Sequence, residues 1–290
     1  MHDIGRSLLH HTTPLRHALG HLFDNFRGLA ACVIVTVVLV TALFGPMLAP
    51  NDPIQQHLTD RLQGASWRYP LGTDALGRCI LSRIMHGART SVLTGSVIVA
   101  VSATAGICLG ALAGYMGGVL DRLVMRTVDV LLSFPGLVLA IVLAGVIGPG
   151  LLGAMLALSL VHWTSYARML RGEVLRTREE LWVDAARALG VSHLRIFVRH
   201  ILPNTVAPVI VMASFGLGHM ILAAAALSFL GLGAQPPDPE WGAMLNRGRD
   251  FMRSAPQLMT WPGLAITVTV LGFNLLGDCL QDALDVHSPK

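Results

Sequence analysis

The stretch Val130–Ala167, VLLSFPGLVLAIVLAGVIGPGLLGAMLALSLVHWTSYA, contains no Asp, Glu, Lys or Arg over 38 residues. As one helix it would be about 57 Å long, roughly twice the thickness of the hydrocarbon core of a bilayer. Three glycines and a proline between Gly145 and Gly150 lie near its middle and predict a tight turn. The stretch therefore predicts two membrane-spanning helices, Asp129–Ile147 and Leu151–Met169, joined by that turn.

The composition of the whole chain agrees with a membrane location. Of the 290 residues, 53% are hydrophobic and 13% are charged, whereas soluble domains carry about 25% charged residues. The apolar residues form long unbroken runs instead of the short alternating segments of an outer-membrane barrel. We therefore predict an all-α membrane protein with six transmembrane helices. The other uncharged stretches are Gly28–Asn51, Thr90–Leu120, His200–Pro237 and Ser254–Gly277.

The distribution of basic residues predicts the orientation. With the N-terminus inside, 13 of the 21 basic residues fall in cytoplasmic segments and eight fall in outer segments. Both termini are then cytoplasmic. The expected divisions are a cytoplasmic N-terminal segment 1–28, a first transmembrane helix 29–49, an outer loop 50–89, a transmembrane domain 90–285 with a cytoplasmic loop 170–203, and a tail 286–290.

Several function classes are excluded or disfavoured by missing residues. Lys290 is the sole lysine of the chain, and a nucleotide-binding P-loop needs a lysine before Ser or Thr at a helix start. If ATP drives this protein, another subunit binds it. The middle of each predicted span lacks the acidic or basic side chain that ion-coupled transporters usually use. A passive channel and an externally powered permease remain.

Two sets of residues within the spans have a structural and a functional interpretation. Gly106, Gly110, Gly114 and Gly118 repeat every four residues, which predicts a close helix–helix contact; a pore-lining strip is the alternative. His162 and His219 are ionisable side chains deep in the predicted spans. Each is either a hydrogen-bonded interior histidine or a residue on the path of a substrate or metal.

The basic segment Arg168–Pro203 is predicted to contain two short helices. Glu173–Leu189 forms the first, Gly190 ends it, Ser192 caps the second and Pro203 stops it. The second helix would carry an apolar stripe that fits a protein partner or, alternatively, an anionic lipid surface. This stripe consists of Leu194, Phe197, Val198 and Ile201.

Within this segment, Asp184-Ala185-Ala186, Gly190 and Leu202-Pro203 resemble the EAA loop of permease subunits of bacterial ATP-binding-cassette (ABC) importers. The sequence departs from the family pattern at Asp184, where Glu is usual, and at His200, where Ile is usual. The resemblance implies that these residues contact an ATPase subunit through a short coupling helix.

Four other motifs resemble the C-type permease subunit of dipeptide, oligopeptide and nickel importers, which implies a type I ABC importer permease fold. Two departures are Cys79, where Asp is usual, and Val286, where Pro is usual. The motifs are Leu71-Gly72-Thr73-Asp74-Ala75-Leu76-Gly77-Arg78, Ser228-Phe229-Leu230-Gly231-Leu232-Gly233, Pro239-Glu240-Trp241-Gly242 and Asn274-Leu275-Leu276-Gly277-Asp278.

The resemblance also implies the partners. A second homologous permease, two ABC ATPase subunits that hold ATP and Mg, and an extracytoplasmic solute-binding protein would assemble with this chain in the lipid of the bacterial inner membrane. Neither a cofactor in this chain nor a nucleic acid is expected. A peptide is the expected substrate, ahead of nickel or a metal chelate, although His162-Trp163 and Gly218-His219-Met220 resemble the nickel branch. A passive channel or membrane scaffold is the alternative from another class.

Overall fold

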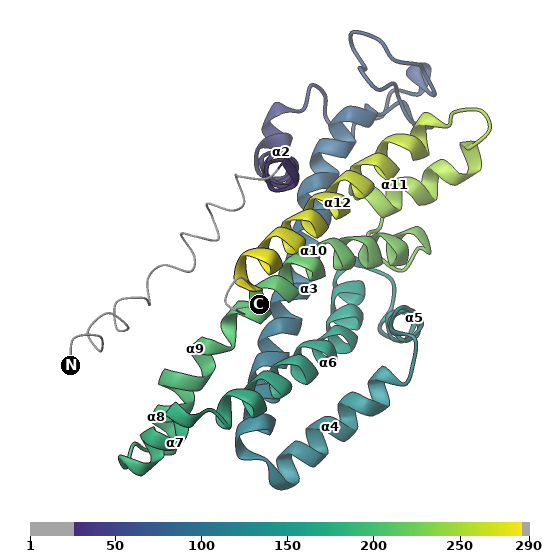
Figure 1. The fold of residues 1–290 in the computed structure, drawn as a ribbon. Coiled ribbons are helices and arrows are strands. Elements are labelled where there is room, and N and C mark those ends of the chain that lie inside the picture. The colour runs from purple at the N-terminus through teal and green to yellow at the C-terminus, as the bar shows by residue number, and fades with distance from the viewer. Residues whose placement is uncertain (1–25, 286–290) are drawn as a thin grey trace.

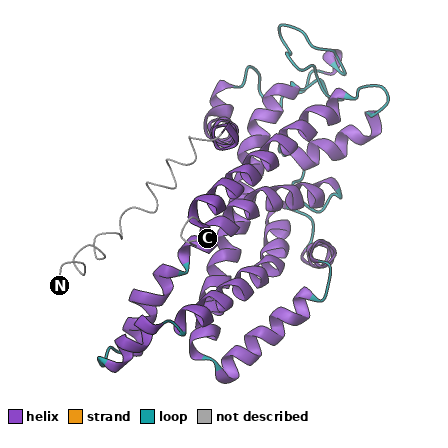
Figure 2. Cartoon of the chain, in the orientation of Figure 1, coloured by secondary structure: helices purple, strands orange, loops and turns teal. Residues whose placement is uncertain are grey.

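The computed structural model describes residues 26–285, which form helices joined by turns and loops (Figures 1 and 2). One isolated bridge, between Thr73 and Cys79, is the extent of β-structure in this range. The predicted all-α class is therefore confirmed for the described residues, whereas residues 1–25 of the predicted N-terminal segment and the tail 286–290 lie outside them. The helices are α2 (Phe26–Leu48), α3 (Ile80–Met116), α4 (Gly118–Leu132), α5 (Gly136–Ile147), α6 (Leu151–Arg178), α7 (Leu181–Ala188), α8 (His193–Ile196), α9 (Leu202–Asn204), α10 (Val206–Phe229), α11 (Trp241–Gly248) and α12 (Gln257–Asp285).

Four helices are long and apolar enough to cross a membrane. They are α2, α3, most of α10 and most of α12, and the bent pair α4–α5 makes a fifth if it is counted as one span. The predicted single helix Asp129–Ile147 is wrong, because α4 and α5 meet at an angle of 93°. Pro135 lies in this break. Proline has no N–H to donate and disfavours a helical conformation in the residue before it, which explains why α4 ends here.

Helix α6 contains the predicted span Leu151–Met169 but continues to Arg178. Its second half is rich in polar and aromatic residues, such as Thr164 and Tyr166, which lowers its hydropathy. Both of these side chains are buried by other parts of the protein. A crossing by α6, and with it the full count of six, therefore stays a prediction.

Helix α3 is the central element and contacts α2, α6 and α10 (Figure 1). It begins at Ile80, ten residues before the predicted Thr90, so the outer loop is shorter than 50–89. The difference arises because the uncharged run begins after Arg89, whereas the helix includes both Arg89, which is exposed, and Arg83. Arg83 is 1% exposed and donates from Nη1 to the carbonyl of Pro53 at 2.7 Å. A charged residue held in this way does not end the helix.

The glycine repeat brings α3 and α6 into backbone contact. A methyl group added to Gly106 would lie 2.8 Å from the carbonyl oxygen of Trp163, and one added to Gly114 would lie 3.0 Å from that of Arg171. Gly110 is equally close to Ala167, whereas Gly118 lies beyond the contact in a positive-φ turn. The packing interpretation is confirmed for the first three glycines, and the pore-lining alternative is wrong for them.

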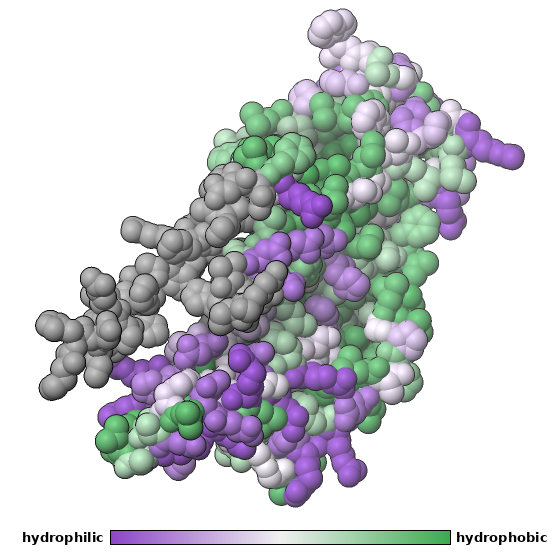
Figure 3. Space-filling model, viewed as in Figure 1, coloured by the Kyte–Doolittle hydropathy of each residue, from purple (hydrophilic) through white to green (hydrophobic). Residues whose placement is uncertain are grey.

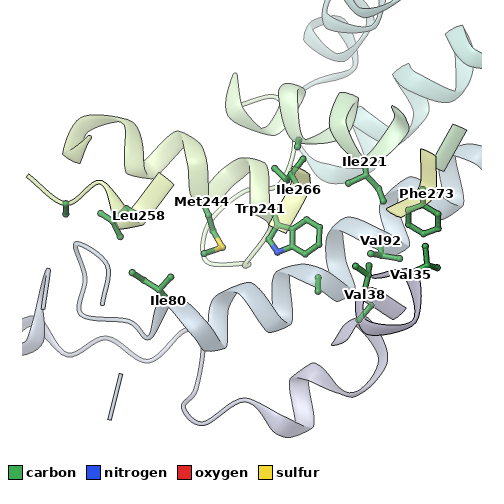
Figure 4. Close-up of a cluster of buried hydrophobic side chains, with 14 residues drawn as sticks. Val35, Val38, Ile80, Val92, Ile221, Trp241, Met244, Leu258, Ile266 and Phe273 are labelled. Atoms are coloured by element: carbon green, nitrogen blue, oxygen red, sulfur yellow. The ribbon is translucent and has the colours of Figure 1, made fainter. Parts of the chain in front are cut away.

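A second packing centre joins α2, α3, α10, α11 and α12 around Trp241 (Figure 4). The indole of Trp241 is 2% exposed, and its Nε1 donates to the carbonyl of Ile84 at 3.1 Å. Its Cδ1 would be 2.9 Å from a methyl group at Gly87, so the absence of a side chain there makes room for the ring. Trp241 is therefore a core residue that fixes the start of α11 against α3.

Candidate functional site

The candidate site is the segment 179–205, which contains α7, α8 and α9 and lies at one end of the molecule (Figure 1). Figure 3 shows hydrophilic residues gathered at this end and hydrophobic residues over the middle of the molecule. This distribution fits a protein whose middle lies in lipid and whose ends lie in water.

The turn after α7 is fixed by glycine. Gly190 has φ = +77°, and its N–H donates to the carbonyl of Arg187 at 2.9 Å. The N–H of Val191 donates to the carbonyl of Ala186 at 3.1 Å. These two bonds define a Schellman motif, in which a left-handed residue satisfies the last carbonyls of a helix. Gly190 therefore ends the helix as the sequence predicts, and the space around it is open.

The inner face of the segment is anchored to α3 and α6. Val183, Ile196 and Ile201 are fully buried, and they pack with residues of both helices, including Leu170 and Val174. The anchoring of α7–α9 by apolar contacts means that a force applied to the segment reaches these two helices.

Hydrogen bonds reinforce this attachment at the end of α3. The hydroxyl of Tyr115 donates to the carbonyl of His193 at 2.8 Å, and its ring lies 4.8 Å from that of Phe197. Arg178, the last residue of α6, donates from Nη1 to the carbonyl of Tyr115 at 3.3 Å. The ends of α3 and α6 are thus tied to each other and to the segment.

The outer face of α7 presents residues with helical spacing. Leu181, Asp184, Ala185 and Ala188 are exposed at positions i, i+3, i+4 and i+7. Asp184 accepts from Nη1 of Arg187 at 2.8 Å, with its side chain 61% exposed. Because Ala185 and Ala188 on this face are small, a partner can approach the helix closely beside the carboxylate.

Large apolar residues continue this outer face. Leu181 is 86% exposed, Leu189 is 84% exposed and Leu194 is 73% exposed. Exposed leucines at a watery end of a protein are unfavourable unless another surface covers them. The face therefore has the character of a protein contact.

The predicted site residues divide between the two faces. Asp184, Ala185, Gly190 and Pro203 are exposed, whereas Ala186 and Leu202 pack against the apolar cluster under the segment. The structure thus brings the residues of the predicted motif into one segment but does not give them one common surface.

Four local predictions are corrected. The predicted helix Glu173–Leu189 is interrupted after Arg178, and Pro203 lies in the first turn of α9, which begins at Leu202, instead of ending a helix. Ser192 occupies the N-cap position without a capping hydrogen bond from its side chain. The predicted stripe is divided, because residues 197–201 form a π-helical turn that directs Ile201 inward while Leu194 stays exposed.

His162 and His219 come together between α6 and α10. Their ring centroids are 6.3 Å apart, and the ring of Tyr166 lies edge-on at 5.4 Å from that of His162. Both histidines line a cavity of about 170 Å³ whose other walls are mostly apolar. Nε2 of His162 and the hydroxyl of Tyr166 are buried and have no hydrogen-bond partner within residues 26–285.

This geometry bears on both interpretations of the histidines. His162 is an interior residue, but it is not fully hydrogen-bonded in the described structure. In the described part of the chain, no group of three or more His, Cys, Asp and Glu side chains has a metal-binding arrangement. The pair offers two imidazoles beside a small cavity, fewer ligands than the three or four protein side chains of a usual zinc site.

Sequence reasoning missed two ion pairs that join α4 to α6. Arg171 donates to Asp121 from Nε at 2.5 Å and from Nη2 at 2.7 Å, and Arg168 donates to Asp129 at 2.5 Å. Acidic residues among the arginines of the predicted cytoplasmic segments are a signal for these pairs. The pairs hold both ends of α4 against the helix that leads to the candidate site.

Comparison with known families gives two matches along the chain. Residues 106–287 match the family described as "Binding-protein-dependent transport system inner membrane component". Residues 13–65 match the family described as "N-terminal TM domain of oligopeptide transport permease C".

Similar proteins cover nearly the whole chain. A dipeptide transport system permease protein, DppC, of Alkalihalophilus pseudofirmus is 43% identical over 273 residues, which are 94% of this chain and 90% of the relative. A glutathione transport system permease protein, GsiD, of Escherichia coli is 45% identical over 274 residues, with the same shares covered.

A solved structure has a similar fold. It is an inward-facing conformation of the MetNI methionine ABC transporter, which matches with a TM-score of 0.51 and 19% identity over 67% of this chain and 94% of that chain. At this identity the likeness concerns the fold alone, and it agrees with the predicted type I importer fold.

Proposed function

Because this chain belongs to the C-type permease subunits of binding-protein-dependent ABC importers, we propose that it forms half of a peptide-conducting channel in the bacterial inner membrane. The other half is a second homologous permease. Two ATPase subunits hold ATP and Mg, and a solute-binding protein delivers the peptide from outside. The chain itself binds no nucleotide and holds no cofactor.

The observation that carries this proposal is the two-faced segment 179–205. Its outer face offers an open turn at Gly190, the carboxylate of Asp184 and exposed leucines for an ATPase surface. Its inner face is packed against α3 and α6. A change in the spacing of the ATPases therefore moves two long helices, and ATP hydrolysis elsewhere opens and closes the path by alternating access.

Peptides are favoured over nickel or its chelates for two reasons. Similar proteins include dipeptide, di/tripeptide and glutathione permeases. The His162–His219 pair, the feature that resembles the nickel branch, supplies two imidazoles and forms no metal-binding group with a further His, Cys, Asp or Glu among the described residues. These relatives give no support to the passive-channel and scaffold alternatives.

The orientation follows from the same assignment. If the segment 179–205 contacts ATPases, it lies in the cytoplasm, as the bias of basic residues also predicts. Both termini are then cytoplasmic, and the loop before α3 faces the solute-binding protein.

The test is a pair of substitutions at Gly190, read by uptake of a labelled dipeptide and by ATPase activity of the assembled complex. Gly190→Ala strains a left-handed residue but adds little bulk, so uptake is reduced modestly. Gly190→Trp places a large ring on the open face and abolishes both uptake and its coupling to ATP hydrolysis.

A matched control separates docking from misfolding. Gly231 has φ = +84° and equally open surroundings, but it follows α10 and lies away from the segment. Gly231→Trp imposes the same strain and bulk without touching an ATPase and should retain coupling. Normal uptake by the Gly190→Trp complex, present in the membrane at wild-type amounts, would refute the docking role.

A further inference from the structure

A second pocket lies at the end of the molecule opposite to the segment 179–205. It has a volume of about 340 Å³ and is formed by the loop before α3, the start of α3, α11 and the turn that follows α11. Ile80, Met244, Phe251 and Leu258 supply an apolar part of its wall. The remaining wall is strongly charged.

The charges that line this pocket do not balance. Arg78, Arg83, Arg247 and Arg249 face two acidic residues, Asp74 and Asp250. Two of the arginines are already paired. Arg78 donates to Asp74 from Nε and Nη2, both at 2.7 Å, and Arg249 lies 3.7 Å from Asp250.

Arg83 is one of the two arginines in excess. Its side chain is 2% exposed; Nη1 donates to the carbonyl of Pro53 at 2.7 Å, and Nε lies 3.7 Å from Oδ2 of Asp74. Its Nη2 is buried and has no partner in the described part of the chain. Because Asp74 is shared with Arg78, its carboxylate is a poor counter-charge for this second guanidinium.

Arg247 is the other arginine in excess. Both of its Nη atoms are buried and lack a hydrogen-bond partner among residues 26–285. Burial, followed by repulsion from Arg78, lowers the pKa of Arg247. A guanidinium nevertheless keeps its proton, so an unpaired one in a buried wall creates a strong preference for an anion.

Two other carboxylates, Asp238 and Glu240, lie near these arginines. Asp238 forms no ion pair with either of them in the described structure, and Glu240 is engaged elsewhere. Glu240 accepts from the N–H groups of Gly242 and Ala243 at 2.9 and 2.8 Å and caps the start of α11. The unused donors of Arg83 and Arg247 therefore have no internal acceptor in the described structure.

We propose that this pocket binds a carboxylate, held by the free guanidinium donors of Arg247 and Arg83. The planar fork of a guanidinium matches the two oxygens of a carboxylate. The apolar wall suits the carbon atoms attached to it, and the volume accommodates a small molecule or one side chain. The carboxylate comes either from a free peptide or from an acidic side chain of the solute-binding protein. Both sources rest on the proposed function.

The first arm of the test uses small molecules and the assembled complex in detergent. Acetate, dialanine and dialanine amide are titrated, and the unfolding midpoint is followed, since a ligand of the folded state raises it. Dialanine and acetate should raise the midpoint saturably, and the amide should not. Arg247→Gln should weaken dialanine binding at least tenfold, and Arg247→Lys should restore part of it.

The second arm measures binding of the solute-binding protein to the same complexes at two salt concentrations. If the solute-binding protein binds the Arg247→Gln complex more weakly than the unchanged complex, and with a smaller dependence on salt, the occupant is a carboxylate of that protein. Arg249→Gln is the control in both arms, because Arg249 lines the same pocket but is exposed and paired. Arg83→Gln is the second test variant if Arg247→Gln lowers the amount of folded complex.

Two results would overturn the carboxylate site. One is equal binding of dialanine and its amide together with unchanged docking of the solute-binding protein. The other is that Arg247→Gln and Arg83→Gln both bind dialanine and the solute-binding protein as well as the unchanged complex does. Binding in the first arm needs neither ATP nor uptake, so a negative result there leaves the importer proposal standing.

Discussion

The close contact of α3 with α6 predicts a large effect of a single methyl group at Gly110. A Cβ atom there would lie 2.8 Å from Cα and 2.9 Å from C of Ala167. Both are backbone atoms, which cannot rotate away as a flexible side chain can. The Gly110→Ala substitution therefore forces the two helices apart.

The size of the effect follows from two opposing contributions. Overpacking of a tight interior costs about 1–3 kcal/mol, and the upper end applies where backbone obstructs the new group. Replacing glycine by alanine within a helix stabilises the folded state by about 0.5–1 kcal/mol. Gly110→Ala should therefore destabilise the protein by about 2 kcal/mol. Gly172→Ala in α6, where nothing lies within 4 Å, should stabilise it by the helix contribution alone.

The assay is the unfolding midpoint of the purified assembly at one fixed heating rate. A difference of about 3 kcal/mol between the two variants corresponds to a gap of about 6 °C or more for a domain of this size. Gly172→Ala controls for the chemistry of the substitution, because both glycines belong to the same helix pair. If both variants had the same midpoint, the close approach of α3 and α6 would not exist.

Two further predictions concern the histidine pair and the topology. His162→Gln with His219→Gln should reduce uptake of a dipeptide and of nickel alike, since the pair lacks further metal ligands in the described residues; a loss confined to nickel, measured at equal amounts of complex, would restore the metal interpretation. Cysteines at Ser66 and Ser192, both exposed, in a chain without its native cysteines should react differently with an impermeant thiol reagent outside intact cells. The first should be labelled at once and the second after permeabilisation, whereas the reverse pattern would invert the topology.

The sequence predicts those features that depend on local chemistry. Long uncharged runs place the helices in a membrane, a four-residue glycine repeat predicts a close contact, and Gly190 ends a helix because a left-handed residue is needed there. The same reasoning fails at Pro135, because the stretch is apolar on both sides of the break and hydropathy does not register a change of direction.

Features that depend on contacts between distant segments lie beyond the sequence pattern. His162 and His219 meet because α6 and α10 have one particular register, which neither helix specifies alone. Arg83 and Arg247 line one pocket although 164 residues separate their numbers. Within each local segment, both arginines look like ordinary solvated charges, and their lack of partners becomes visible once the fold surrounds them.

The two ends of α3 connect the proposed coupling face with the proposed carboxylate pocket. At one end Tyr115 holds the segment 179–205, and at the other Arg83 lies in the pocket wall. The 37 residues of α3 span about 55 Å, so a tilt of about 5° moves one end relative to the other by about 5 Å. Because glycines press α3 against α6, the two helices move together and do not slide independently. In the proposed importer, a tilt of this size driven by the ATPases would change the distance between Arg83 and Arg247, because these residues belong to different helices.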